Sequence, residues 1–322
     1  MRRNASGISC LVAIDKPAGM TSHDVVAHVR RAVGERRVGH TGTLDPLATG
    51  LLVVGIGPAT RLLGMLSLSE KRYEACICFG KETTTDDRAG DTSRVASVPQ
   101  ELLNENFASE ALGALVGKHN QVPPAYSAIS IEGRRAYARA RAGERVVLAP
   151  RPIQIYDARL LALDKQPDGS IVWRCEFSVS KGTYIRSLAR DLGRKLQSAA
   201  YLLSLRRIAA GSLSLDACVP LAKLEAKGAP LLPCCCVDPA QAAGLPVRLL
   251  DAAELSFAVC GKRISAGRVA DPAAERRCAR TPRDHEQVCL VFEDRLYGIW
   301  EARQEGLVCK VNFPGGVSGV RQ

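Results

Sequence analysis

The sequence lacks the residue spacings of a metal site, although it contains twelve cysteines. It has no Cys-x-x-Cys pair and no His-Glu-x-x-His motif, so we expect no structural zinc. It also lacks an apolar run long enough to span a bilayer, and the apolar stretch at residues 10–14 is too short for a signal-peptide core. These absences favour a cytoplasmic protein with reduced, mostly buried thiols and no membrane partner.

Acidic residues are few relative to basic ones, 33 against 44, which gives a formal net charge of +11. Such a charge suits a polyanionic partner such as RNA or DNA, although a merely basic soluble protein would show the same balance. The length of 322 residues and the hydrophobic content of 46% indicate a globular chain of two domains.

The residue pattern changes near residue 245, from mixed helices and strands to short β-like runs with glycine turns. Thr21 and Asp24 have the spacing of a capping box, and Gly34 would end the helix that they begin. Residues 50–57 form an apolar run typical of a strand buried on both faces, and residues 71–80 alternate as in a half-buried strand.

Residues 118–151, here called the arm, concentrate positive charge. They include seven Lys or Arg and only two Glu, which gives the segment a net charge of +5. Prolines, Gln121, Tyr126 and Tyr137 are interleaved with these charges. The composition suits an exposed segment that lies along phosphates and stacks on bases, whereas a solvated helix face is the common alternative. The candidate phosphate contacts are Arg134, Arg135, Arg139 and Arg141.

Three short segments contain residues with chemical potential: Asp45 in GHTGTLDPLATGLL, Tyr73 in KRY, and Arg186 in SKGTYIRSLARDLG. An acid before proline often caps a turn, and that role is compatible with catalysis by Asp45. Arg186 falls in the first turn of a predicted helix capped by Thr183, where positive charge is unfavourable. A carboxylate such as that of Asp45 would compensate this charge.

Taken in order, these segments resemble those of the bacterial TruB-type tRNA pseudouridine synthases. The matching segments are DKPAGMTS, GHTGTLDPLATGLL, KRYEA, PPAYSAISIEGRRAYARARAG, SKGTYIRSLARDLG and LRRIA, over about residues 8–215. The C-terminal part resembles, with weaker motifs, the PUA domain of these enzymes. Pattern and resemblance together imply an α+β pseudouridine synthase fold over residues 1–245, with a mixed, largely antiparallel central sheet, and a small PUA-like β barrel over residues 246–322.

The resemblance implies that a uridine in the T-loop of tRNA, at position 55, is isomerised to pseudouridine without a cofactor. The bond from N1 to the ribose breaks, the uracil rotates, and C5 bonds to the ribose instead. Asp45, paired with Arg186, would act as a nucleophile or as a base toward the sugar. Tyr73 would lie against the uracil and accept the C5 proton, directly or through water.

The same resemblance assigns the remaining site residues. Tyr184 and Leu205 would line the pocket of the flipped base, and His40 would contact the nucleotide or fill the gap that the base leaves. Lys16 would brace the catalytic loop. The expected partner is the T-arm of tRNA, clamped by the arm, with no guide RNA and with a monomer sufficing.

Two other functions remain open at this point. A non-catalytic RNA-binding or tRNA-folding protein would use the arm and the β domain equally well, but it would not need Asp45. A guide-RNA-directed, dyskerin-like synthase would share the catalytic loop, but such enzymes usually carry lysine-rich extensions and lack the arm. The arm therefore favours an enzyme that recognises its substrate by itself.

Overall fold

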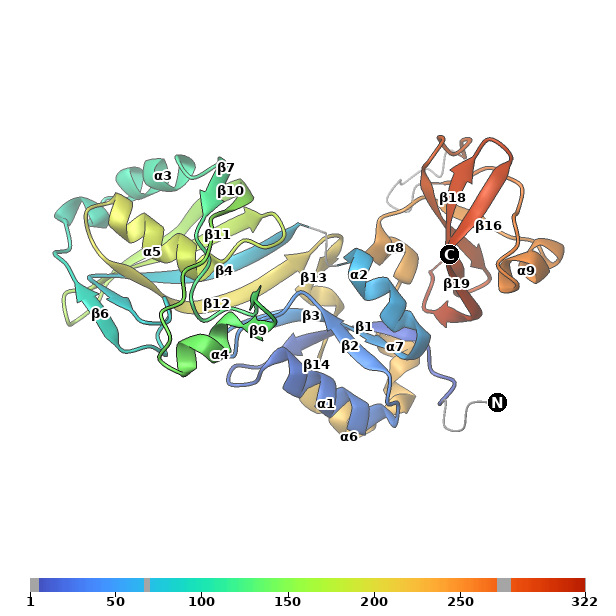
Figure 1. The fold of residues 1–322 in the computed structure, drawn as a ribbon, viewed down its shortest axis with the longest axis horizontal. Coiled ribbons are helices and arrows are strands. Elements are labelled where there is room, and N and C mark those ends of the chain that lie inside the picture. The colour runs from blue at the N-terminus through green and yellow to red at the C-terminus, as the bar shows by residue number, and fades with distance from the viewer. Residues whose placement is uncertain (1–5, 67–69, 271–278, 322) are drawn as a thin grey trace. The chain divides into compact units, whose positions relative to one another are not determined.

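The structure, a computed structural model, describes residues 6–66, 70–270 and 279–321. The chain divides into two compact units, each of which is described by itself (Figure 1). Unit 1 comprises Met1–Leu68 and Ala209–Gln322, and unit 2 comprises Ser69–Ile208. The predicted domain boundary near residue 245 lies inside unit 1 and stays a prediction.

Unit 1 contains the N-terminal and C-terminal segments of the chain. Its N-terminal elements are β1 (Cys10–Lys16), α1 (Ser22–Val33), β2 (Val38–Thr41), β3 (Thr49–Ile56), the 3-10 turn η1 (Gly57–Leu62) and α2 (Leu63–Leu66). Its C-terminal elements are β13 (Leu213–Ser214), η3 (Leu215–Ala217), β14 (Cys218–Pro220), α6 (Leu221–Lys227), η4 (Ala229–Leu231), α7 (Leu232–Cys235), β15 (Cys236–Val237), α8 (Pro239–Ala243), β16 (Val247–Leu249), α9 (Ala252–Val259), β17 (Gln287–Phe292), β18 (Arg295–Arg303) and β19 (Gly306–Ser318).

Unit 2 is the middle of the chain. Its elements are β4 (Lys71–Phe79), β5 (Lys81–Thr83), β6 (Thr92–Val95), η2 (Gln100–Leu103), α3 (Glu105–Gly113), β7 (Gly117–Gln121), β8 (Ser130–Ile131), β9 (Arg134–Arg135), α4 (Ala136–Arg141), β10 (Arg151–Lys165), β11 (Ile171–Val179), α5 (Ile185–Lys195) and β12 (Ala200–Ala210), which ends just beyond the unit boundary.

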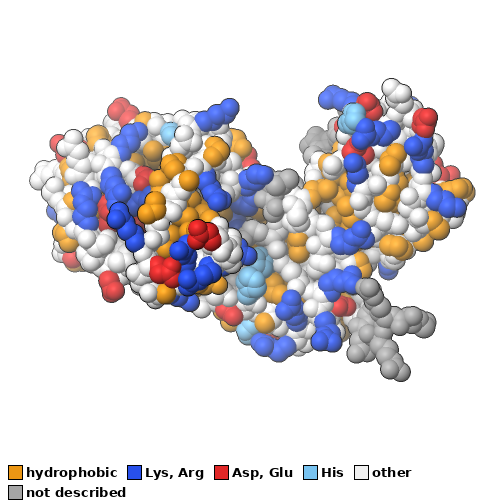
Figure 2. All heavy atoms as spheres, in the orientation of Figure 1, with side chains coloured by type: hydrophobic (Ala, Val, Ile, Leu, Met, Phe, Trp, Pro, Cys, Tyr) orange, Lys and Arg blue, Asp and Glu red, His pale blue; other side chains and the backbone are white. Residues whose placement is uncertain are grey.

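The sheet of unit 2 has the strand order β12-β4-β11-β10-β7. The pairings of β4 with β11, β11 with β10 and β10 with β7 are antiparallel. Lys71, Tyr73 and Ala75 alternate as buried residues on β4, as the sequence predicts. The pairing of Arg151 with Gln121 closes the base of the arm at the edge of this sheet. Figure 2 shows Lys and Arg side chains spread over the visible face of the unit.

Strand β1 is the centre of unit 1. It pairs antiparallel with β3 along its whole length, parallel with β14, and parallel with the end of β19 through Cys10 and Ser318. Seven of the eight β3 residues are buried, which confirms the strand predicted from the apolar run. Helix α1 has the predicted capping box of Thr21 and Asp24 and ends at Gly34 in the left-handed conformation.

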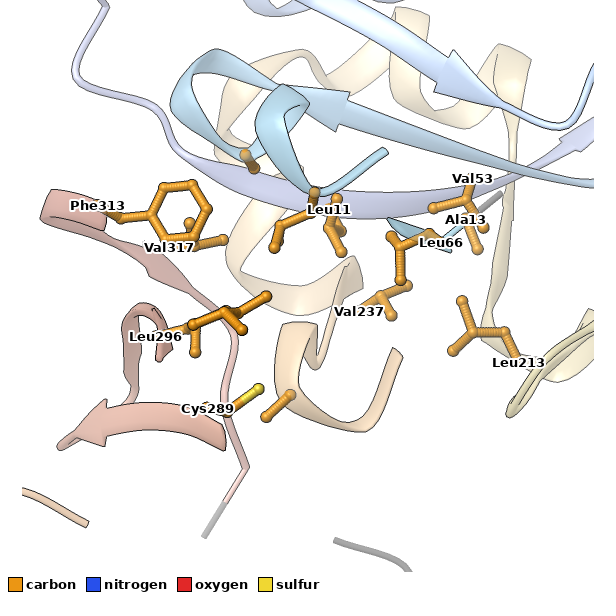
Figure 3. Close-up of a cluster of buried hydrophobic side chains, with 14 of the residues drawn as sticks. Leu11, Ala13, Val53, Leu66, Leu213, Val237, Cys289, Leu296, Phe313 and Val317 are labelled. Carbon is orange, nitrogen blue, oxygen red and sulfur yellow. The ribbon is translucent and has the colours of Figure 1, made fainter. Parts of the chain in front are cut away.

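Apolar side chains from both segments of unit 1 meet in one core, which joins β1 and β3 to the C-terminal strands (Figure 3). Leu11 and Val53 pack in this cluster with Leu296 and Phe313. A second core, around Trp300 and Leu290, consists only of residues after 249 and lies among the C-terminal strands of unit 1. The mixed, largely antiparallel α+β fold predicted from the sequence is confirmed.

The cysteines are less buried than predicted. The buried thiols are those of Cys10, Cys78, Cys175 and Cys289, whereas the other described thiols are partly or fully exposed. Some of the latter fall where an alternating strand or a short surface helix turns them outward, as for Cys76 and Cys234. In the described part of the chain, no three His, Cys, Asp or Glu side chains could hold a metal ion. No helix of the described residues is long and apolar enough to cross a membrane.

Candidate active site

The loop that contains Asp45 is held in unit 1 by the buried ammonium group of Lys16. Lys16 is fully buried at the end of β1, and its Nζ donates to the carbonyl oxygens of Pro17 at 2.9 Å, Met20 at 2.6 Å and Pro46 at 3.4 Å. The Gly19 N–H donates to the same Pro46 carbonyl at 2.8 Å. The DKPAGM turn is thus tied to the residue that follows Asp45.

Helix α1 holds the residue that precedes Asp45. The buried hydroxyl of Ser22 donates to the Leu44 carbonyl at 3.1 Å and accepts from the Leu44 N–H at 2.9 Å. The Ala48 N–H donates to the Asp45 carbonyl at 3.0 Å, which closes a turn with Pro46 at its second position. The half-buried Asp45 side chain therefore comes from a short loop whose backbone is fixed on both sides.

His40 lies in unit 1 on β2, where it pairs with Val54 of β3. Its ring meets that of His23 edge to face, with the ring centroids 5.2 Å apart. Both histidines thus lie at the same end of the unit as the start of α1. A contact of His40 with a nucleotide stays a prediction.

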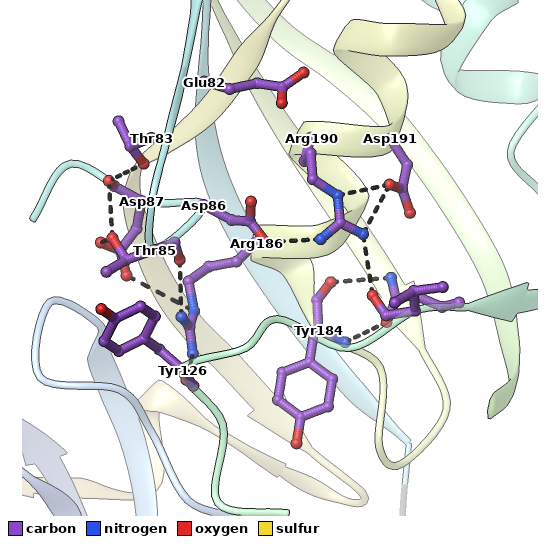
Figure 4. A network of polar contacts seen from close by, with 12 residues as sticks. Glu82, Thr83, Thr85, Asp86, Asp87, Tyr126, Tyr184, Arg186, Arg190 and Asp191 are labelled. Atoms are coloured by element: carbon purple, nitrogen blue, oxygen red, sulfur yellow. Dashed lines mark hydrogen bonds and ion pairs between the residues drawn. The ribbon is translucent and has the colours of Figure 1, made fainter. Parts of the chain in front are cut away.

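The guanidinium of Arg186 is buried in unit 2 and faces the carboxylate of Asp87 (Figure 4). The Arg186 Nε atom lies 3.7 Å from Asp87 Oδ2, and the two Nη atoms donate to the carbonyls of Thr85 and Tyr126, each at 2.9 Å. Asp87, which was not predicted from the sequence, supplies a negative charge beside the guanidinium of Arg186. The predicted pairing of Arg186 with Asp45, which belongs to unit 1, stays a prediction.

Asp87 is itself held in a fixed orientation. Its Oδ1 accepts hydrogen bonds from the Thr85 hydroxyl at 2.6 Å and from the Ala89 N–H at 3.0 Å. Backbone hydrogen bonds of Asp86 and Arg88 to Leu202 attach this turn to β12. The only sequence signal was the TTTDDRAG segment itself, an ordinary polar turn, because the contact to Arg186 spans about a hundred residues.

Helix α5 begins differently from the prediction. Its N-cap is Tyr184, not Thr183, and the cap interaction comes from the arm: the Gln121 side chain accepts from the Tyr184 N–H at 2.9 Å. Gln121 also donates to the Tyr184 carbonyl at 3.0 Å. A side chain distant in sequence replaced the local cap, which propensity rules do not anticipate.

Tyr73 and Leu205 are both buried in unit 2, 7% and 8% exposed. Tyr73 pairs with Phe177 on β11, and Leu205 lies on β12. Lys71 shares the buried face of β4 with Tyr73. Burial, and then the positive charges of Arg207 and Lys181, lower the pKa of Lys71 to about 8. Three basic side chains, those of Lys71, Lys181 and Arg207, therefore lie near one another in this largely apolar part of unit 2.

The arm contains the hairpin β8–β9 and helix α4, and its four predicted phosphate contacts differ in their surroundings. Arg134 and Arg139 both pair with Glu144, at 2.9 and 2.7 Å. Arg135 donates to the Ala128 carbonyl at 2.8 Å, and the Arg141 guanidinium lies 5.7 Å from the centroid of the Tyr137 ring. Their contact with RNA stays a prediction.

The family model described as TruB family pseudouridylate synthase (N terminal domain) matches residues 30–185 of the chain. A tRNA pseudouridine synthase B of Thermobifida fusca is 47% identical over 258 residues, which cover 79% of this chain and 86% of that protein. A tRNA pseudouridine synthase B of Leifsonia xyli is 41% identical over 307 residues, which cover 95% of this chain and 97% of that protein.

Among solved structures, the chain is similar to one in an H/ACA RNP bound to a substrate RNA containing 2'-deoxyuridine, with a TM-score of 0.67. The alignment covers 95% of this chain and 85% of that chain at 19% sequence identity. A chain of the archaeal box H/ACA sRNP Nop10-Cbf5 complex aligns with a TM-score of 0.65 at 20% identity, over 94% of this chain and 84% of that one. At these identities the similarity shows a shared fold.

Proposed function

The chain belongs to the TruB family of pseudouridylate synthases, and we propose that it isomerises uridine 55 in the T-loop of tRNA to pseudouridine with Asp45 as its catalytic residue. The relatives named tRNA pseudouridine synthase B, at 41–47% identity over most of the chain, carry the assignment of the reaction. The fixed backbone on both sides of Asp45 supports the choice of this carboxylate.

In this reaction the N1–C1' bond of uridine breaks and a C5–C1' bond forms, while the C5 hydrogen leaves as a proton and N1 takes up a proton from solvent. Asp45 acts on the nucleotide either as a nucleophile or as a base toward the sugar. A loop fixed through Pro46 and Leu44 orients such a carboxylate before the substrate arrives, which lowers the entropic part of the barrier.

Residues of unit 2, together with His40 of unit 1, complete the proposed site. Arg186 stabilises charge at the reacting nucleotide and pairs with Asp45 in the working enzyme, while Tyr73 lies against the uracil and receives the C5 proton. Tyr184 and Leu205 line the pocket of the flipped base, whose removal from the stack costs a few kcal/mol. His40 contacts the nucleotide or fills the gap that the base leaves.

Recognition of the substrate is assigned to the arm and to the C-terminal β domain, residues 246–322. The arm arginines lie along the phosphates of the T-arm, and the chain needs neither a guide RNA nor a second copy of itself. We place the reaction in the cytoplasm. A folded loop with splayed bases suits such recognition better than a duplex, because side chains cannot read the narrow major groove of A-form RNA.

The test is tritium release from 5-tritiated uridine in an unmodified tRNA transcript, with wild type, Asp45→Asn and the exposed control Asp164→Asn. Wild type and Asp164→Asn should release tritium, whereas Asp45→Asn should bind the transcript without releasing any. Full release by Asp45→Asn would remove Asp45 from the mechanism. Binding without release by wild type would instead favour the non-catalytic RNA-binding protein.

A further inference from the structure

The root of the arm, residues 121–126, is hydrogen-bonded to helix α5 and its N-cap (Figure 4). Gln121 exchanges two hydrogen bonds with the backbone of Tyr184. Arg186 donates to the Tyr126 carbonyl at 2.9 Å, and Arg190 donates to the Val122 carbonyl at 3.0 Å. Two arginines four residues apart on the helix therefore hold two carbonyls four residues apart on the arm.

Arg190 is held in place from the opposite side by carboxylates. Its Nη1 lies 2.8 Å from Asp86 Oδ2, and its Nε and Nη2 lie 2.9 and 2.8 Å from Asp191 Oδ1. The side chains of Arg190 and Asp86 are 12% and 11% exposed. Because this ion pair of Arg190 and Asp86 is nearly buried, it fixes the orientation of the Arg190 guanidinium. It thereby fixes the direction of the N–H that donates to the Val122 carbonyl.

The two neighbouring acids of one turn thus serve two arginines of one helix: Asp87 faces Arg186, and Asp86 faces Arg190. Of these two arginines, Arg186 belongs to the proposed catalytic residues and Arg190 does not. We propose that Arg190 is a positioning residue for tRNA binding, which fixes the root of the arm on α5 so that the arm meets the RNA in one orientation. This inference rests on the proposed function and adds a residue to it.

A fixed arm and a loose arm differ mainly in the entropy lost when RNA binds. Without the link from Arg190, the arm must be ordered by the tRNA itself, which weakens binding without changing the bound reacting groups. Loss of one charge-assisted hydrogen bond corresponds to about a tenfold change in an equilibrium constant. We therefore expect KM for tRNA to rise about tenfold with kcat within about twofold.

The test variant is Asp86→Asn/Arg190→Met, compared with Asp86→Asn alone, because the double change leaves no unpaired buried carboxylate at residue 86. The matched control is Glu82→Gln/Arg194→Met compared with Glu82→Gln alone, which removes in the same way an arginine one turn further along α5 together with the charge of its buried partner. Steady-state tritium release from a tRNA transcript gives kcat and KM. Hydrogen exchange of the RNA-free proteins reports the protection of the arm and, separately, of β10 and β11.

The inference predicts a raised KM and faster exchange confined to the arm for Asp86→Asn/Arg190→Met relative to Asp86→Asn, and neither effect for Glu82→Gln/Arg194→Met relative to Glu82→Gln. Equal KM and equal arm exchange in the double variant and Asp86→Asn would overturn it. Faster exchange throughout unit 2, or a loss of kcat at unchanged KM, would overturn it too, because Arg190 would then stabilise the fold or serve the chemistry. An inactive wild type would refute the proposed function. Unchanged hydrogen exchange of the arm in Asp86→Asn/Arg190→Met would refute the proposal that Arg190 fixes the arm on α5.

Discussion

Asp87 Oδ2 lies 3.7 Å from the Nε atom of Arg186, and the side chains of these two residues are 7% and 4% exposed. A buried guanidinium needs a nearby negative charge, and it also needs its donors satisfied. Asp87 supplies the charge, while the carbonyls of Thr85 and Tyr126 accept from the Nη atoms. The orientation of the proposed catalytic arginine is therefore decided within unit 2.

The substitution Asp87→Asn removes that charge with little change of shape. We expect kcat for pseudouridine formation to fall about a hundredfold, because small displacements of a group such as Arg186 cost rates of this order. Tritium release measures kcat, and filter binding measures tRNA affinity, which should change less. Asp91→Asn, an exposed acid of the same turn, is the control. Full kcat in Asp87→Asn would show that Arg186 does not depend on Asp87.

The substitution Lys16→Met removes the ammonium that ties Pro17, Met20 and Pro46 together. Buried carbonyls that lose a charged donor cost about 1–3 kcal/mol, so the free energy of unfolding should fall by that amount. A loosened loop should also lower kcat more than it raises KM. Urea unfolding and tritium release test both effects, with the exposed Lys165→Met as control. Wild-type kcat in a destabilised Lys16→Met would show that Lys16 serves only the fold.

The combined replacement of the four arm arginines, Arg134, Arg135, Arg139 and Arg141, by Gln should weaken tRNA binding. The slope of log Kd against log salt should fall by about one for each phosphate that an arginine no longer neutralises. Binding titrations at several salt concentrations measure both quantities. The control replaces four exposed basic residues outside the arm, namely Arg159, Lys165, Lys223 and Lys227. An unchanged slope in the arm variant, or an equal weakening in the control, would contradict a specific clamp.

The buried carboxylate of Glu82 makes part of the stability dependent on pH. Hydrogen bonds from Arg194 and then from Arg94, opposed by burial, lower the pKa of Glu82 below its ordinary value of 4.5. Because the folded state holds this proton more weakly, the stabilisation is fully present above pH 4.5 and is lost as the pH falls through the folded pKa.

At pH 7, Glu82→Gln should therefore lower the free energy of unfolding by about 2 kcal/mol. The difference from wild type should shrink as the pH falls below 4.5. Denaturant unfolding over a range of pH measures it, with Asp164→Asn as the exposed control. A difference that stays constant down to the acid limit would show that the charge of Glu82 contributes nothing.

Local patterns in the sequence determined much of the architecture. The capping box of Thr21 and Asp24 and the stop at Gly34 define α1, because these contacts join residues three or four apart. The apolar run of β3 reflects burial of the strand on both faces, and the alternation of β4 reflects burial on one face. The ordered motifs also sufficed to identify the family, since each lies within one short segment.

Only the tertiary structure decided which polar groups meet. Arg186 contacts Asp87 and Arg190 contacts Asp86, each across about a hundred residues, and Gln121 caps a helix 63 residues away. The resemblance assigned Lys16 to bracing the catalytic loop, but the full burial of Lys16 and the three carbonyls that accept from it could not be read from a sequence neighbourhood typical of an exposed turn. Periodicity records which face of an element is apolar, whereas the partner of a buried charge depends on which elements the fold brings together.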